Sequence, residues 1–415
     1  MHTQWPRVGS PDPVDPLTRS FVATRPALRT WPPSVAPDPL PEPSPQAQPA
    51  APKRRVSSLD ALRGFDMLWI IGGDEIAKAV AKIWPNSVVK AVCLQFSEHA
   101  AWVGLRFYDV IFPLFLFIMG AALPFSIGRS LQSGAPRAAV IRKILVRAAI
   151  LFALGLIYNG ALQAPDWGHV RVFGVLQRLA LGYAVAAILF VMIDTRRLVV
   201  TAAAILVGYW ALMGAVPAPG GLAPNYTQVG NLANYVDRLM LRPGQMYELY
   251  GDPEGLISTL PAVASALLGL FAGLWLSSDR SERLKTLGLI LGGLALIALG
   301  LVWAPYFPII KKIWSSSFVL VTGGMSAMLF GVTHWLVDVK GYRKLALPLI
   351  VIGANAILIY LLTAVVDFSS VAGFFLGGFA NRLPHYKELI LACGALLAEW
   401  LLLYFLYRKQ VFVRV

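Results

Sequence analysis

The sequence has little charge, cysteine or histidine. Asp, Glu, Lys and Arg make up 14% of its 415 residues, whereas a soluble domain carries about 25%. The only two cysteines, Cys93 and Cys393, lie far apart in the chain, which excludes a disulfide scaffold and a cysteine-rich metal site. No His-x-x-His, Walker A or dinucleotide fingerprint is present, so the motifs predict neither a metal nor a nucleotide.

Apolar and aromatic residues are abundant instead. Hydrophobic types make up 57% of the chain, with 12 Trp, 14 Tyr and 21 Phe. This composition excludes a disordered chain and an ordinary cytosolic enzyme, and it predicts an all-α, polytopic membrane helix bundle. The net charge of +14 then indicates basic cytoplasmic loops rather than nucleic-acid binding.

The first 52 residues differ from the remainder. They hold 14 of the 29 prolines and no lysine. Because proline removes backbone donors and blocks helices, residues 1–52 are predicted to be a disordered tail. They contain no apolar run long enough for a signal peptide. Residues 53–415 are predicted to form the transmembrane domain.

Apolar runs predict about ten membrane spans in this domain, since about 20 apolar residues cross a bilayer. The runs are 58–73, 103–126, 144–158, 172–193, 198–216, 256–276, 286–302, 315–337, 346–366 and 388–407. If the N-terminus is cytoplasmic, the inner segments hold 18 Lys and Arg in 51 residues, against 10 in 113 for the outer segments. The positive-inside rule therefore predicts that both termini are cytoplasmic. Gly72 and Gly73 are predicted to end or bend the first span.

Ionisable residues from separate segments gather at the predicted outer ends of the spans. Charge within a bilayer is expensive and commonly faces a cavity or a partner, so this pattern is typical of a functional site. The alternative is structural: Arg106 with Asp109, and Arg171 with Asp166, form ion pairs. Asn355, in the middle of the ninth span, alternatively bridges helices by hydrogen bonding.

Among five histidines, His99 is the strongest candidate for acid–base chemistry. It lies at the outer membrane edge just before the second span, and imidazole accepts protons near neutral pH. Asp74, at the outer end of the first span, is predicted to orient its ring. The alternative is that a lone histidine at such an edge is structural.

Several motifs resemble the heparan-α-glucosaminide N-acetyltransferase family. They include Ser-Leu-Asp-Ala-Leu-Arg-Gly at 58–64, Phe-Tyr-Asp-Val-Ile-Phe-Pro at 107–113 and Gly-Ala-Asn-Ala-Ile-Leu-Ile-Tyr at 353–360, with further matches at 115–120, 170–179, 235–239, 252–255 and 337–341. The resemblance runs in order from about residue 56 to the C-terminus.

This resemblance implies a ten-helix transmembrane acyltransferase, most similar to a bacterial inner-membrane member. Such proteins move acetyl from cytosolic acetyl-CoA to an amino sugar on the far side of the membrane, and His99 with Ala100 and Trp102 matches the family's active-site His-Ala-x-Trp pattern. The animal enzyme has an Asn eleven residues after the first-span Arg, where this chain has Asp74 after Arg63.

We therefore predict that His99 is a general base or forms an acyl-imidazole, with Asp74 as its partner. The acceptor is an outer sugar or glycolipid, and Trp102 is a predicted stacking surface. Residues assigned by depth and resemblance to substrate or CoA binding are Arg63, Asp109, Arg171, Gln177, Arg178, Asp252, Glu254, Lys311 and Asn355. The competing hypothesis is a secondary transporter or channel that uses the same polar cluster.

Overall fold

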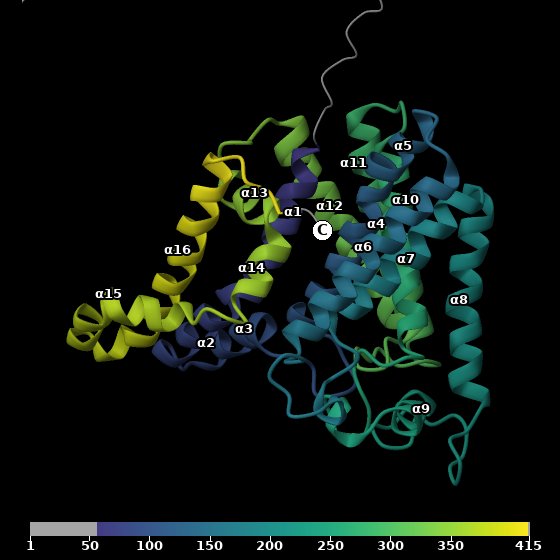
Figure 1. Cartoon of the computed structure of the whole chain (residues 1–415), viewed down its shortest axis with the longest axis horizontal. Coiled ribbons are helices and arrows are strands. Elements are labelled where there is room, and N and C mark those ends of the chain that lie inside the picture. The colour runs from purple at the N-terminus through teal and green to yellow at the C-terminus, as the bar shows by residue number, and fades with distance from the viewer. Residues whose placement is uncertain (1–55, 414–415) are drawn as a thin grey trace, which may run out of the picture. The chain divides into compact units, whose positions relative to one another are not determined.

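A computed structural model describes residues 56–413, and within them the chain is helical with no strand (Figure 1). The all-α class predicted from composition is confirmed. The predicted disordered tail, 1–52, lies outside the described residues.

The described residues contain sixteen α-helices. They are α1 (Ser57–Leu68), α2 (Asp74–Ile83), α3 (Ser87–Ser97), α4 (Ile111–Leu123), α5 (Arg129–Gln132), α6 (Arg137–Tyr158), α7 (Val175–Met192), α8 (Thr195–Ala215), α9 (Leu232–Met240), α10 (Thr259–Leu276), α11 (Glu282–Trp303), α12 (Ser316–His334), α13 (Leu347–Ala354), α14 (Ala356–Leu362), α15 (Phe368–Arg382) and α16 (Lys387–Arg408). π-Helical turns follow α1, α4 and α12.

Seven helical segments of the described chain are long and apolar enough to cross a membrane. They are Phe107–Gln132, Val175–Met192, Thr195–Ala215, Thr259–Leu276, Glu282–Trp303, Ser316–Val339 and Pro384–Arg408. The expected spans 58–73, 144–158 and 346–366 are helical too, as α1 with its π-turn, α6, and α13 with α14. They are not among the seven, so the count of about ten stays a prediction.

The long connections lie together at one end of the bundle. In Figure 1, α2, α3, α9 and α15 lie at the lower end, whereas α5 and the start of α1 lie at the upper end. The segments before α4, before α7, before α10 and before α12 therefore meet where the ionisable residues of the sequence were expected to gather.

The first helix bends at Gly72 and Gly73, where the sequence predicted an end or a bend. A π-turn at Trp69–Gly73 separates α1 from α2, and Gly72 leaves the helical conformation there. The predicted end or bend at Gly72 and Gly73 is confirmed. The bend turns α2 away from the axis of α1, which leaves Ile70 facing the cavities described below.

Two glycines let α1 and α13 approach at backbone distance. A Cβ added to Gly64 would lie 1.8 Å from the carbonyl oxygen of Leu349, and one added to Gly353 would lie 1.8 Å from that of Asp60. Small residues at helix crossings of this kind allow close backbone packing in membrane bundles. The contact fixes the position of α14, which carries one wall of the candidate site.

We expect Gly64→Ala to destabilise the protein by about 1–3 kcal/mol, because neither backbone can yield without separating the helices. Thermal unfolding of the purified protein, followed by circular dichroism, measures this as a lowered Tm. Gly373→Ala in α15 is the matched control, since a Cβ there meets no atom within 4 Å. An unchanged Tm for Gly64→Ala would show that the helices separate at little cost.

Candidate active site

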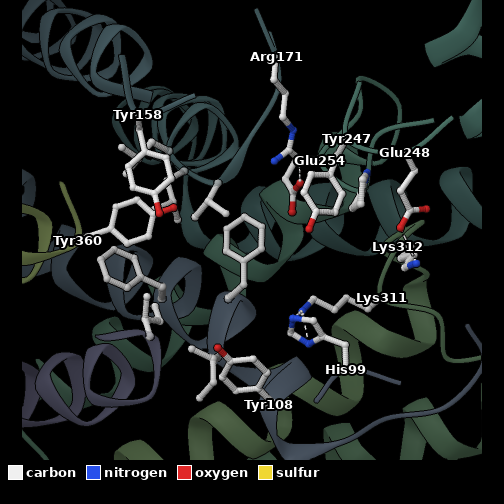
Figure 2. A pocket seen from close by; sticks show the side chains of 18 of the residues that line it. His99, Tyr108, Tyr158, Arg171, Tyr247, Glu248, Glu254, Lys311, Lys312 and Tyr360 are labelled. Carbon is white, nitrogen blue, oxygen red and sulfur yellow. Dashed lines mark hydrogen bonds and ion pairs between the residues drawn. The ribbon is translucent and has the colours of Figure 1, made fainter. Parts of the chain in front are cut away.

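A cavity of about 370 Å³ opens among the long connections (Figure 2). Its walls come from the end of α1, the start of α4, the end of α6, the start of α7, α14, and the loops before α4, α10 and α12. The residues that line it are Met67, Ile70, His99, Ala100, Trp102, Tyr108, Ile111, Phe112, Phe115, Tyr158, Arg171, Val175, Leu176, Leu179, Tyr247, Glu248, Pro253, Glu254, Lys311, Lys312, Ile357 and Tyr360. This volume suits a small organic group, since ligand pockets span about 300–1,000 Å³.

His99 lies at the cavity and is held by Asp109. The His99 Nδ1 atom is 2.9 Å from Oδ1 of Asp109. The Asp109 side chain is fully buried while that of His99 is 49% exposed. The backbone N–H groups of Ala100 and Arg106 both donate to Oδ2 of Asp109 at 3.0 Å. The carboxylate is therefore fixed from two sides, and it can accept the Nδ1 proton and leave Nε2 as a base.

The local backbone explains why these two residues meet. Between α3 and the 3-10 turn Phe107–Val110, the chain passes through Gly104, whose φ of +120° favours glycine. The Gly104 N–H donates to the carbonyl oxygen of Ile309 at 2.9 Å. This bond ties the His99 loop to the loop before α12, which carries Lys311.

Lys311 lies against both members of the pair. Its Nζ is 2.9 Å and 3.2 Å from the two ring nitrogens of His99, and 3.5 Å from Oδ1 of Asp109. Burial lowers the pKa of the Lys311 ammonium, although the nearby Asp109 and Glu254 carboxylates oppose that shift. A lysine of this kind gives up its proton more readily than one in water. Figure 2 shows His99 and Lys311 side by side.

Asp74 does not contact His99 and pairs with Lys78 at 2.9 Å. The carboxylate in contact with the His99 ring is that of Asp109, so the predicted contact of Asp74 with the ring is corrected. The Tyr108 ring stacks on His99 with centroids 4.8 Å apart, and its hydroxyl interacts with Asp74.

Arg171 joins a second ionic group on the opposite wall. Its Nε and Nη2 atoms donate to the two oxygens of Asp252 at 2.9 and 2.8 Å, and Nη2 also donates to Glu254. Burial alone would lower the pKa of Arg171, but the two carboxylates outweigh it and raise that pKa. The Tyr247 ring lies 4.6 Å from this guanidinium.

The structural alternative predicted two ion pairs, Arg106 with Asp109 and Arg171 with Asp166, and the structure contains neither of these pairings. Asp166 pairs with His169 at 3.0 Å and not with Arg171. The Arg106 guanidinium pairs with Glu98 at 2.8 Å, and only its backbone N–H donates to Asp109. Arg171 and Glu254 line the cavity and pair with each other, whereas Asp109 is buried and reaches the cavity only through His99.

Seven of the predicted residues do not line the cavity. Asp74, Asp109 and Asp252 are described above, and the others are Arg63, Gln177, Arg178 and Asn355. Asn355 holds the C-terminal segment, since it donates to the Val411 carbonyl at 3.0 Å and accepts from the Val413 N–H at 2.9 Å. This is close to the structural alternative, a polar bridge. Arg63 pairs with Asp60 at 3.2 Å, on the α1 surface that faces Gly353.

Arg178 and Gln177 lie buried just behind the cavity wall. Arg178 donates to the carbonyl of Gly255 at 3.3 Å and to Ser258, and its guanidinium lies 4.8 Å from the Trp314 ring. It therefore supports the turn that carries Glu254. The Gln177 side chain is fully buried and has no hydrogen-bond partner among residues 56–413.

Sequence reasoning missed several residues of the cavity. Tyr158 and Tyr360 stack with centroids 4.5 Å apart at the end of the cavity farthest from His99 in Figure 2. Lys312 and Glu248 both line the cavity and pair at 2.6 Å. Aromatic residues are frequent along the chain, so no sequence signal separated these tyrosines from others. Trp102 lines the cavity as predicted for a stacking surface, and its indole donates to the Tyr226 carbonyl at 2.8 Å.

Comparisons with known proteins agree with the motif series. A family model described as heparan-alpha-glucosaminide N-acetyltransferase, catalytic, matches residues 55–301. The Homo sapiens heparan-alpha-glucosaminide N-acetyltransferase is 28% identical over 425 aligned residues, which cover 87% of this chain and 60% of the human protein. Its Mus musculus counterpart is 29% identical over 376 residues, covering 77% of this chain and 56% of the mouse protein.

The chain thus spans somewhat more than half the length of these relatives. The family match includes His99, Asp109, Arg171 and Glu254, whereas Lys311 lies beyond it. It also covers more than half of the chain. The chain therefore belongs to the heparan-alpha-glucosaminide N-acetyltransferase family.

Proposed function

We propose that this protein is an integral-membrane acetyltransferase that moves acetyl from acetyl-CoA to the amino group of a sugar. The observation that carries the proposal is the His99–Asp109 pair, held beside Lys311 at a cavity in a chain of this family. Acyl transfer to an amine needs a base for the proton and a donor for the developing oxyanion. The three side chains supply both.

His99, Asp109 and Lys311 each have a separate role in the proposed reaction. The acceptor nitrogen forms a bond to the thioester carbonyl carbon while Nε2 of His99 takes its proton. Asp109 stabilises the resulting imidazolium through Nδ1. Lys311 donates a hydrogen bond to the oxyanion. The C–S bond then breaks, and the proton on His99 passes to the departing thiolate, which leaves His99 neutral for the next cycle.

The polar part of the cavity lining suits a sugar. Arg171, Tyr247, Glu248, Lys312 and Trp102 supply charged groups and aromatic faces around it, and sites for small polar ligands combine an apolar surface with a few such groups. The count of basic residues supports cytoplasmic ends for the described chain, so the cavity faces away from the cytosol. The acceptor is then an extracytoplasmic amino sugar or glycolipid, as on a bacterial inner membrane.

Reconstitution into liposomes tests this function. We expect radiolabelled acetyl-CoA, added on the side that the basic loops face, to yield N-acetylglucosamine from glucosamine enclosed on the other side. Product analysis by mass spectrometry measures the transfer. Release of the enclosed glucosamine with no acyl donor, and no acetylated product when acetyl-CoA is added, would overturn the proposal in favour of a transporter.

A further inference from the structure

The structure contains a second cavity, of about 680 Å³. Its walls are the π-turn after α1 with the start of α2, the segment that joins α14 to α15, and one face of α16. Ile70 lines both cavities, but none of the residues assigned to acetyl transfer lines the second one. The second cavity is therefore a separate space that the acetyl-transfer chemistry does not use.

Four carboxylates line this second cavity, and three of them have partners. Glu75 pairs with Lys78 at 2.7 Å and Glu388 with Lys82 at 2.5 Å. Asp367 accepts the N–H groups of Ser369 and Ser370 at the start of α15. Each of these three carboxylates already has a partner within the protein, so none of them requires a ligand. Together they form the polar rim of the second cavity.

Glu399 is different. Its side chain lines the cavity, the residue is only 2% exposed, and Oε2 has no hydrogen-bond partner among residues 56–413. It lies eleven residues beyond Glu388 on the same helix, which is about 16 Å along the axis. A carboxyl group at this depth of an apolar helix is costly unless a partner or ligand compensates it.

The lining of the second cavity also includes apolar side chains. Ile71, Val366, Leu391 and Ala395 contribute to it. No three His, Cys, Asp or Glu side chains of the described chain converge as metal ligands would. The site therefore suits a cation with an apolar body more than a metal ion.

We propose that this cavity binds an amphiphilic primary amine, whose ammonium group pairs with Glu399 and whose apolar body fills the space toward the rim. The ammonium group would supply the hydrogen-bond donor that Oε2 of Glu399 lacks, and it would do so with a charged group. The volume is within the range of about 300–1,000 Å³ typical of ligand sites. The same chemistry is offered by a free alkylamine and by an aminophospholipid headgroup.

Binding of radiolabelled hexylamine to the full chain in phosphatidylcholine nanodiscs tests the proposal, with empty nanodiscs subtracted. At about pH 8 the amine is protonated. We expect saturable binding to the wild type and at least about tenfold weaker binding to Glu399→Gln, as loss of a charged hydrogen bond implies. Glu388→Gln is the matched control, and its affinity should stay within about twofold because its carboxylate is already paired.

Further variants and probes separate the explanations. Ala395→Phe fills the cavity but keeps Glu399, and it should also abolish binding. This second variant keeps the proposal testable if Glu399→Gln fails to fold. His99→Ala should bind hexylamine normally, so failure of the acetyltransferase proposal would leave this one standing. Weaker hexylamine binding in discs that contain phosphatidylethanolamine would identify the lipid amine as the occupant. Equal binding of hexanol and hexylamine, or equal affinity of wild type and Glu399→Gln, overturns the proposal.

Discussion

Replacing His99 by alanine is expected to lower the rate of acetyl transfer by about a hundred- to ten-thousandfold, the usual contribution of a positioned general base. The variant loses the proton acceptor, while Asp109 keeps its hydrogen bonds from Ala100 and Arg106 and its proximity to Lys311. Because the His99 side chain is half exposed, its removal should leave the Tm nearly unchanged. Acetylated product formed per minute by the reconstituted protein measures the effect.

His169→Ala is the matched control for this experiment. His169 lies in the loop before α7 and also pairs with an aspartate, Asp166, but its side chain is largely exposed and does not line the cavity. Its activity should therefore remain close to that of the wild type. If His99→Ala retained wild-type activity at unchanged protein yield, the proposed role of His99 would be abandoned.

The sequence predicted the long helices better than the short ones. Apolar runs mark α4, α7, α8, α10, α11, α12 and α16, since lipid forces their backbones into helix. The helices α2, α3, α9 and α15 were expected only as parts of loops, because each is amphipathic or short and owes its stability to neighbours rather than to lipid. Gly72 could be recognised in advance because glycine near the end of a span predicts a bend.

Depth and residue type identified much of the candidate site, but not its pairings. His99, Lys311, Arg171 and Glu254 all line the cavity, as expected from charged residues placed at one end of a bundle. The partner of His99 could not be chosen from the sequence, because Asp74 and Asp109 have the same side chain and similar depth. The choice depends on the turn through Gly104, which brings Asp109 back against the ring.

Asp109→Asn tests that pairing directly. An asparagine amide can donate to Nδ1 of His99, which would place the ring proton on Nε2 and remove the base. We expect a fall in acetyl transfer of about a hundred- to ten-thousandfold, as when the carboxylate of a catalytic triad is replaced. In that orientation the amide oxygen takes the place of Oδ2 and still accepts both backbone N–H groups. The free energy of unfolding should therefore fall by only about 1 kcal/mol, since a neutral acceptor makes weaker hydrogen bonds than a carboxylate.

Asp74→Asn provides the matched comparison, because it makes the same chemical change at the carboxylate that contacts Lys78 and Tyr108 instead of His99. Its acetyl transfer should fall less than about tenfold, since surface ion pairs contribute little and the His99 tautomer is preserved. Rates measured at saturating acetyl-CoA, with Tm recorded for each variant, separate a tautomer effect from unfolding. If Asp74→Asn lost more activity than Asp109→Asn, Asp74 would be the functional partner, and His99 would have to move toward α2 during the reaction.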